Sequence, residues 1–422
     1  MNSAPPQVSV INLGCARNLV DAQMILGRLK AKGFSVVDAG QARVLIINTC
    51  CFIDAARQET IDTILDVLQW KKEGRVDKVI LAGCLVQRYG QDLLDELKDI
   101  DALVGVPVFA KDRCLDQVAL TPGHYAYLKI CEGCYNLCSY CVIPRLKGPL
   151  ASRNIRSLVR EMRLLNARGV REVNLIGQDV SAYGIDIDGR SALVNLLRQL
   201  TAAAGDIDWI RLLYLFPARV TDELLDYVAG EEKICNYIDL PLQHINARIL
   251  KAMNRPMAPE RIKKLIDRIR QKIPGVCLRS SFIVGFPGET EREFEELMDF
   301  IRDVGFDRLG AFPYSREEGT RAYALKPQVP AKVRQERYDI LMREQQEISR
   351  RRLQGRIGGR VKVLIDEKVP EQENIFLGRT EGDAPEVDGR VVVTSDRPLK
   401  PGVFVEVYIN DSTEYDLYGT AV

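Results

Sequence analysis

Residues 131–141 read Cys-Glu-Gly-Cys-Tyr-Asn-Leu-Cys-Ser-Tyr-Cys, and this stretch decides the fold. Within it, Cys134, Cys138 and Cys141 have the spacing C-x3-C-x2-C. They directly follow a predicted strand at 125–130, at the strand's carboxyl end, where barrel folds place their active sites. Three thiolates at this spacing can hold three irons of a cubane cluster and leave the fourth iron open, and such clusters prefer soft thiolate ligands. The stretch therefore predicts an iron–sulfur site at the active edge of a barrel.

Cys131 leaves a second interpretation open, because it brings four cysteines into eleven residues. Four thiolates so close in sequence could also form a closed structural zinc site. The position directly after a barrel strand favours the iron–sulfur interpretation.

Around this stretch, residues 123–353 alternate strand and helix patterns at a regular interval. Such alternation indicates a parallel sheet with right-handed crossovers. Six units are too few for a closed eight-stranded barrel, so we expect an open, partial (β/α)6 barrel followed by a charged helix at about 331–354. The predicted strands are 125–130, 172–176, 209–215, 237–240, 277–284 and 308–313, and the predicted helices include 157–168, 191–204, 221–228, 258–272 and 293–303. Thr290 and Glu293 have the spacing of a capping box that would begin the last of these helices.

The preceding segment, residues 1–122, also alternates strands and helices, with strands predicted at 8–13, 43–48 and 77–82 and a helix at 54–70. Cys15, Cys50 and Cys84 each lie at or just past the end of one of these strands. Parallel strands bring their carboxyl ends to one edge of a sheet, where open sheets bind ligands. A single buried cysteine is usually structural, but three in the same topological position predict a second metal cluster.

The last segment, residues 354–422, carries valine alternations at 360–365, 390–394 and 403–409 separated by Gly, Pro and Asp turns. This spacing predicts a small all-β barrel. From residue 356 on there are eight Lys and Arg against thirteen Asp and Glu, a net charge of −5. Such a domain would repel a phosphate backbone.

Composition excludes several classes of protein. The 422 residues are 46% hydrophobic and 28% charged, as in folded globular chains, and the net charge of +1 is far below that of proteins that bind nucleic acid by bulk electrostatics. No run approaches the ~18 apolar residues of a membrane helix, and the start lacks a signal-peptide pattern, so we expect a cytoplasmic protein. The only histidines are His124 and His244, which disfavours a His-rich zinc hydrolase or a Ser-His-Asp enzyme. Eleven cysteines indicate thiolate chemistry instead.

Five cysteines are predicted to have no ligand role. Cys235 and Cys277 lie at or beside barrel strands, where we expect them to pack, and Cys114 has no partner pattern. Cys51 and Cys131 adjoin predicted ligands and are not expected to replace them.

Taken together, these motifs resemble a known family. C-x3-C-x2-C with the aromatic Tyr140 before its last cysteine, after the first strand of a partial barrel, is similar to the radical S-adenosylmethionine (SAM) superfamily. The three-cysteine domain before it and the small β-barrel after it, which resembles a TRAM domain, are similar to the methylthiotransferases over essentially the whole chain. Residues 240–246 (LPLQHIN) and 378–389 (GRT and DAPEVDG) resemble the RimO-type branch, which modifies an aspartate of a ribosomal protein.

The resemblance implies an α/β chain with an N-terminal parallel-sheet domain, a central radical SAM partial barrel and a TRAM-like barrel for substrate recognition. It implies that Cys134, Cys138 and Cys141 hold a 4Fe–4S cluster that binds SAM, and that Cys15, Cys50 and Cys84 hold a second 4Fe–4S cluster that delivers sulfur. The enzyme would add a methylthio group to the β-carbon of an aspartate in small-subunit ribosomal protein twelve, with SAM as radical source and methyl donor. An electron donor such as flavodoxin or ferredoxin is implied, and direct RNA binding is not expected as the main determinant. The residues that resemble the superfamily's SAM contacts are Tyr140, Gly177, Gln178, Arg211, Gln243, Ser281 and Gly285.

Two other functions compete with this one. A tRNA adenosine methylthiotransferase would use the same chemistry, but the acidic end domain argues against RNA. A non-catalytic iron–sulfur or zinc protein that acts as a carrier or scaffold would close its metal site with four ligands, whereas an enzyme needs an open one.

Overall fold

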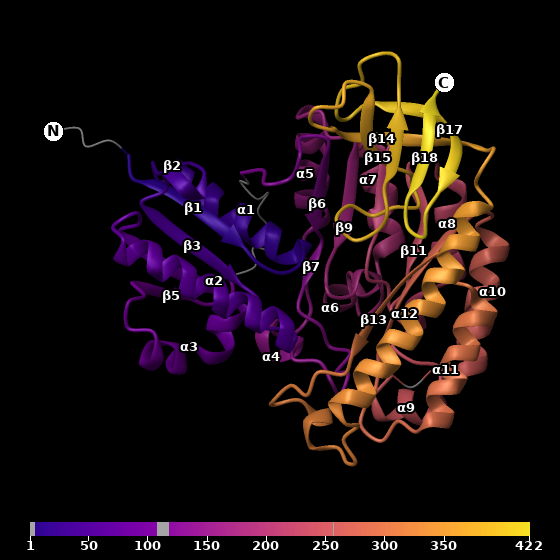
Figure 1. The fold of residues 1–422 in the computed structure, drawn as a ribbon, viewed down its shortest axis with the longest axis horizontal. Helices are drawn as coiled ribbons and strands as arrows, with labels where there is room; N and C mark the ends of the chain where they lie inside the picture. Colours follow the sequence, from indigo (N-terminus) through magenta and orange to yellow (C-terminus); the bar gives the residue numbers. More distant parts are fainter. Residues whose placement is uncertain (1–4, 108–117, 256) are drawn as a thin grey trace.

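The computed structural model describes residues 5–107, 118–255 and 257–422 (Figure 1). Three β-structures follow one another along the chain: an open parallel sheet, a six-stranded parallel sheet that curves into a partial barrel, and a closed five-stranded barrel. This order agrees with the predicted fold class. Figure 1 shows the first sheet (indigo) beside the partial barrel and the closed barrel (yellow) over one end of it.

The first sheet has the strand order β2-β1-β3-β4-β5, with all pairs parallel. Its strands are β1 (Gln7–Asn12), β2 (Ser35–Val36), β3 (Val44–Thr49), β4 (Lys78–Gly83) and β5 (Ala102–Val104), and its helices are α1 (Ala16–Ala31), α2 (Asp54–Lys72) and α3 (Cys84–Glu96). The three longer strands lie within one residue of the predicted ranges. The two- and three-residue edge strands β2 and β5 were not predicted, because such short strands show no alternation.

The partial barrel has the order β13-β12-β11-β10-β9-β6, again parallel. Its strands are β6 (Tyr125–Lys129), β9 (Glu172–Ile176), β10 (Trp209–Leu212), β11 (Ile234–Asp239), β12 (Cys277–Val284) and β13 (Arg308–Pro313). The covering helices are α5 (Ile155–Ala167), α7 (Leu193–Ala203), α8 (Asp222–Gly230), α10 (Pro259–Lys272), α11 (Glu291–Val304) and α12 (Ala331–Gln354), with short helices α4 (Ile143–Lys147), α6 (Ile185–Asp188) and α9 (Ala247–Ala252) and the small strands β7 (Cys131–Glu132) and β8 (Ala151–Ser152) between them. The Thr290–Glu293 capping box is formed at the start of α11, as predicted.

The closed barrel has the order β14-β15-β16-β18-β17. Its strands are β14 (Arg360–Lys368), β15 (Ile375–Arg379), β16 (Val391–Thr394), β17 (Phe404–Ser412) and β18 (Leu417–Ala421). The sequence analysis missed β15 and β18, each of which contains a glycine. A Cβ on Gly378 would lie 2.5 Å from the Leu364 carbonyl oxygen, and one on Gly419 would lie 2.4 Å from that of Tyr408. Close strand packing therefore requires glycine at these two positions, and the glycines interrupt the apolar alternation.

One buried apolar cluster joins all three β-structures. It includes Val20 and Met24 of α1, Tyr127 of β6, and Leu364 and Ala384 of the closed barrel. The three units therefore pack as neighbours around a shared interior. Within the described residues, no helix is both long and apolar enough to cross a membrane.

Candidate active site

A pocket of about 430 Å³ opens at the carboxyl ends of the barrel strands. Residues in or just after all six strands line it, and the first domain adds Arg17 and Phe52 while the closed barrel adds Val387. This volume is in the range of small-molecule sites, and the carboxyl edge is where parallel barrels bind their ligands. All three β-structures therefore contribute to one pocket.

The loop between Gly133 and Cys141 forms one wall of the pocket and is fixed at several points. Gly133 has φ +73, and a Cβ there would lie 2.1 Å from the Pro149 carbonyl oxygen, so only glycine fits. The Ser139 hydroxyl donates to the Ala252 carbonyl at 2.7 Å, and the Asn136 amide donates to the Asp179 carboxylate at 2.8 Å. The loop is thus held in place by the barrel's own residues.

Cys134, Cys138 and Cys141 all line the pocket from this loop. Burial raises the pKa of Cys134, and it raises the pKa of Cys141 to about 12. Buried thiols that are costly to ionise alone are suited to a metal centre, because the metal's charge stabilises the thiolate. The Arg255 guanidinium lies 3.6 Å from the Cys138 sulfur and would stabilise negative charge there. The donor set fits the predicted iron–sulfur cluster.

Cys131 does not point into this group. Its thiol is fully buried in the barrel core and lies 3.7 Å from the Asp179 carbonyl oxygen. Across residues 5–107, 118–255 and 257–422, no three His, Cys, Asp or Glu side chains converge closely enough to hold a single metal ion. The Cys131 thiol thus lies against the Gly177–Asp179 segment and does not line the pocket.

The second predicted triad follows three neighbouring strands of the first sheet. Cys15 caps α1 after β1, Cys50 follows β3, and Cys84 is the first residue of α3 after β4. A Cβ on Gly14 would lie 2.9 Å from the Cys50 sulfur, so the loop carrying Cys15 passes directly over Cys50. The topology thus brings the three cysteines to one sheet edge.

Hydrogen bonds fix the loops that carry this triad. The Asn18 amide donates to Leu13 and Thr49 carbonyls at 2.9 and 3.2 Å, and the Thr49 hydroxyl donates to the Ala82 carbonyl at 2.6 Å. Burial raises the pKa of Cys50, and it raises the pKa of Cys84 to about 12. Like the first triad, these buried thiols fit a metal cluster better than free thiolates.

Arg17 lies between the two triads and was not predicted. Its Nε is 3.4 Å from the Cys15 sulfur, its Nη1 donates to the Gly177 carbonyl at 3.3 Å, and its guanidinium stacks 4.6 Å from the Tyr214 ring centre. Burial acts to raise the pKa of Cys15, but Arg17 and nearby backbone N–H groups bring it below its ordinary value of 9.0. A single cation from the first domain therefore faces both the second triad and the barrel's pocket.

The remaining described cysteines do not line the pocket. Cys51 is fully buried in the core of the first domain, and Cys235 and Cys277 are buried near the amino ends of β11 and β12. The Cys277 thiol lies 3.2 Å from the Gly382 carbonyl oxygen, inside the interface with the closed barrel. Cys114 lies outside the described residues.

Four of the seven residues predicted to contact SAM line the pocket, namely Tyr140, Gln178, Gln243 and Ser281. Gly177 and Gly285 are not part of the lining. A Cβ on Gly177 would lie 2.5 Å from the Cys131 sulfur, and the Gly285 N–H donates to the Glu289 carboxylate at 3.0 Å.

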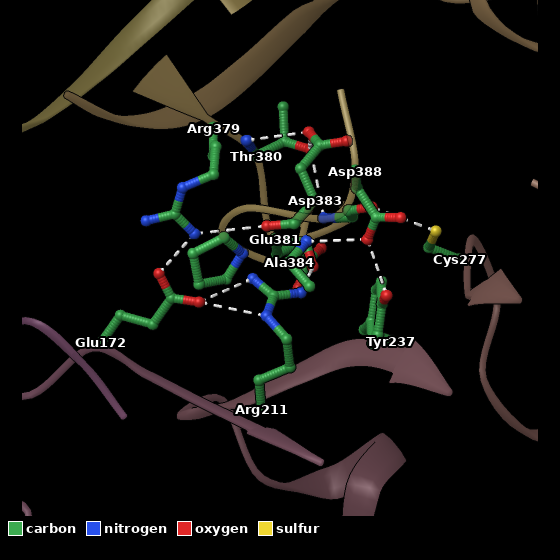
Figure 2. A network of polar contacts seen from close by, with 12 residues as sticks. Glu172, Arg211, Tyr237, Cys277, Arg379, Thr380, Glu381, Asp383, Ala384 and Asp388 are labelled. Carbon is green, nitrogen blue, oxygen red and sulfur yellow. Dashed lines mark hydrogen bonds and ion pairs between the residues drawn. The ribbon is translucent and has the colours of Figure 1, made fainter. Parts of the chain in front are cut away.

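Arg211 also lies outside the lining, so the structure does not place it as a SAM contact. It is fully buried, and its guanidinium pairs with Glu172 at 3.0 Å and donates to the Glu381 carbonyl. Figure 2 shows this group within a network that joins the barrel to the closed barrel. Its side chain is directed at the closed barrel, whereas the other predicted residues Tyr140, Gln178, Gln243 and Ser281 line the pocket.

Strained backbone concentrates at the pocket. Six described non-glycine residues have positive φ, and three of them, Leu137, Tyr214 and Gln243, line the pocket. A fourth, Asn254, donates to the Leu137 carbonyl at 2.8 Å. Such conformations are costly and cluster where a function requires them.

The sequence analysis missed several charged residues of the lining. Asp179 and Asp239 end or follow strands and could have been found from the strand-end rule that gave Gln178. The signal for Arg17 of α1, Arg255 of a loop and Arg279 of β12 is weaker, because arginines are usually solvated. The charged residues of the lining are Arg17, Asp179, Asp239, Arg255, Arg279 and Glu317.

Comparison with known protein families gives three matches along the chain. The Radical SAM superfamily matches residues 128–301, the uncharacterized protein family UPF0004 matches residues 7–105, and the TRAM domain matches residues 357–422. The three matches follow the order of the three β-structures.

Curated relatives align over nearly the whole chain. Ribosomal protein uS12 methylthiotransferase RimO of Syntrophotalea carbinolica is 44% identical over 99% of this chain and 97% of its own length. The protein of the same name from Geobacter sulfurreducens is 42% identical, with 100% of each chain covered.

Among solved structures, the radical S-adenosylmethionine methyltransferase TsrM of Kitasatospora setae matches with a TM-score of 0.55 at 16% identity, over 76% of this chain and 77% of that one. The cobalamin-dependent S-adenosylmethionine radical enzyme OxsB matches with a TM-score of 0.51 at 11% identity, over 82% of this chain and 56% of that one. These likenesses concern the fold alone, and together with the family matches they confirm the predicted fold class.

Proposed function

Since the chain belongs to the RimO family of radical SAM methylthiotransferases, we propose that it adds a methylthio group to the β-carbon of an aspartate in small-subunit ribosomal protein uS12. The observation that carries this proposal is the meeting of two cysteine triads from different domains near one pocket, with Arg17 between them. Joining sulfur to carbon needs a radical source and a sulfur source, and each triad can serve one of them.

Members of the radical SAM superfamily, to which residues 128–301 match, use SAM and a 4Fe–4S cluster. We propose that Cys134, Cys138 and Cys141 hold this cluster, and that Cys15, Cys50 and Cys84 hold a second one. When bound, these groups supply the radical that breaks an unactivated C–H bond, the transferred sulfur and the methyl group.

The chain's own residues bind and orient these groups. Asp179 and Asn254 hold the cysteine loop through Asn136 and the Leu137 carbonyl, so the first triad keeps its geometry when SAM exchanges. Arg255 would donate toward the Cys138 thiolate, and Arg17 toward that of Cys15. We assign Tyr140, Gln178, Gln243 and Ser281 to the binding of SAM, because they line the same pocket.

Substrate and partners follow from the same family. The first domain would span residues 1–122, the radical SAM domain 123–353 and the TRAM-like domain 354–422, which we propose contacts the ribosomal protein. The net charge of −5 in the last domain suits a basic ribosomal protein better than RNA. A flavodoxin or ferredoxin would supply electrons, and a ribosomal substrate would place the reaction in the cytoplasm.

An anaerobic assay tests the proposal. The reconstituted enzyme receives SAM, reductant and sulfide, with uS12 and tRNA offered in parallel, and mass spectrometry follows both products. We expect a methylthio group on an aspartate of uS12 and none on tRNA. Cys134→Ala and Cys15→Ala serve as paired controls: the first should lose SAM cleavage, and the second should keep SAM cleavage while losing sulfur insertion. Modified tRNA with unmodified uS12 would overturn the substrate assignment.

A further inference from the structure

The mouth of the pocket has a distinctive surface. Its four most exposed lining side chains are Phe52, Leu137, Phe312 and Val387, between 40% and 57% exposed, and all are large and apolar. They come from four separate places: the loop before α2, the cysteine loop, strand β13, and the closed barrel. All four line the same pocket, and exposed apolar side chains around one pocket mark an interaction site, whereas scattered ones need no explanation.

Charged groups of the lining are less exposed and already engaged. Asp179 pairs with Arg219 at 2.6 Å, Arg279 with Asp239 at 3.2 Å, and Glu317 with Arg88 at 2.7 Å. The rim itself therefore offers apolar contact, and the exposed Arg321, which donates to the Leu137 carbonyl, is a cation beside it. Aromatic rings can stack on bases, but stacking sites for nucleic acid lie in positively charged grooves. The rim accordingly fits a polypeptide rather than RNA.

The backbone that presents Leu137 and Val387 at the rim includes residues in the strained left-handed conformation. Leu137 has φ 51, a left-handed conformation that is rare for leucine, and Asn254 fixes it there through the Leu137 carbonyl. An exposed leucine gains nothing for the core in return. Strain kept at a solvent-exposed apolar residue indicates a contact made with another molecule.

Val387 is also held in place by its backbone neighbours, Glu386 and Asp388. It follows Glu386, which has φ 69 and accepts a hydrogen bond from the Tyr125 hydroxyl at 3.0 Å. Asp388, the next residue, accepts from the Tyr237 hydroxyl at 2.7 Å and from the Ala384 N–H at 2.9 Å (Figure 2). The turn is anchored in the barrel on both sides of Val387, so its position at the rim is preorganised.

We propose that Phe52, Leu137, Phe312 and Val387 form a docking rim for an extended loop of the protein substrate, with apolar residues on the loop flanking the target aspartate. This inference rests on the proposed function and adds the chemistry by which the substrate is recognised. The rim is complete only when all three domains are assembled, so substrate docking depends on the closed barrel's turn as well as on the barrel.

The test measures binding of uS12 to the reconstituted holoenzyme and, separately, its turnover. Val387→Asp should raise the Kd and the KM for uS12 about tenfold, because a charge replaces an apolar contact. The matched control is Val403→Asp, an exposed valine of the same closed barrel that lines no part of the pocket, and it should change neither constant.

Leu137→Asn separates docking from folding. Asparagine tolerates the left-handed backbone better than leucine, so the variant should be at least as stable as the parent and retain its iron. It should nevertheless weaken uS12 binding several-fold. Leu137→Met should bind nearly as the parent does, since it keeps the apolar contact.

The outcomes distinguish the two proposals. Binding of uS12 without methylthiolation would refute the proposed function. The Kd values of the variants for uS12 would still test whether the docking rim binds it. Parental Kd values in Val387→Asp and Leu137→Asn, or failure of the parent to bind uS12, would overturn the rim. A tRNA stem-loop that binds the parent and is lost in Val387→Asp would show that the occupant is RNA.

Discussion

The two ends of the partial barrel are built from the same six strands and differ in every other respect. At the carboxyl end lie the pocket, the first cysteine triad, the left-handed residues Leu137, Tyr214 and Gln243, and three of the four rim residues. At the amino end, side chains of the barrel strands contact the turn from Arg379 to Gly389 of the closed barrel (Figure 2). Each of the six strands contributes a contact to it, for example Tyr125 of β6 and Arg308 of β13.

Ion pairs hold the amino end closed. Glu172 pairs with Arg379 at 2.6 Å and with Arg211 at 3.0 Å, and Arg379 also pairs with Asp366 at 2.8 Å. Asp383 pairs with Arg308. These charges are buried, so they are tolerable only as partners of one another.

The difference between the two ends of the barrel shows that groups for stability and groups for function lie at opposite ends of the same strands. One end uses fixed charge pairs to bind a domain, and the other keeps thiols, strained backbone and exposed apolar groups for ligands. Arg279 connects the two, because it lines the pocket and also lies 3.4 Å from Asp388 of the closing turn.

The largest effect should come from breaking the carboxyl end. Cys134→Ala removes a predicted cluster ligand, and we expect SAM cleavage to fall by more than about 10³-fold while the fold persists, because no other group can supply the radical. Formation of 5′-deoxyadenosine and iron content provide the measurement. Cys131→Ala is the matched variant and should keep its iron. Equal iron loss in both would mean that Cys131 is a ligand.

The next effect should come from breaking the amino end. Glu172→Ala leaves Arg211 and Arg379 buried without their shared carboxylate, and we expect a loss of about 3–5 kcal/mol in the free energy of unfolding. Urea denaturation provides the measurement. Glu223→Ala removes an exposed partner of Arg198 and should cost less than about 1 kcal/mol. Similar costs in the two variants would contradict the contrast between the ends.

Acid should weaken the amino end through Asp383. Burial acts to raise the pKa of this carboxyl, but Arg308 and hydrogen bonds from Thr380 bring it below its ordinary value of 3.8. A lowered folded-state pKa means that the contribution to stability is present above about pH 4 and is lost as the pH falls below it. Urea denaturation from pH 6 to pH 3 should therefore show a steeper loss in the parent than in Asp383→Asn. Parallel curves would refute this linkage.

The smallest effect should come from a cysteine at the amino end. Cys235 is buried with a pKa raised to about 12 by desolvation, and it lies near no predicted cluster ligand. Cys235→Ala should leave the iron content unchanged and lower stability by about 1 kcal/mol, through the small cavity it creates. A lower iron content in Cys235→Ala would mean that the amino end also binds metal, and it would contradict the contrast between the two ends of the barrel.

The sequence by itself determined most of the strands and the positions of the two cysteine triads at strand ends. Strands β1, β3 and β4 and the six barrel strands follow from local alternation of apolar runs and helix patterns, because these depend on neighbours along the chain. The first triad spans only eight residues, so its members must lie in one loop. The second triad was predictable because parallel strands end at one edge.

Only the tertiary structure decided which arginines face the pocket. Arg17 meets a carbonyl 160 positions away, and Arg211 meets one 170 positions away. No local pattern separates these two arginines. Arg17 nevertheless lines the pocket, whereas Arg211 is buried in the interface between the partial barrel and the closed barrel. Val387 reaches the rim because its turn is anchored on Tyr125 and Tyr237, which lie 261 residues before Glu386 and 151 residues before Asp388. Such contacts arise from how separately formed units pack, and the physical reason they escape the sequence is that packing between units leaves no periodic signal in either one.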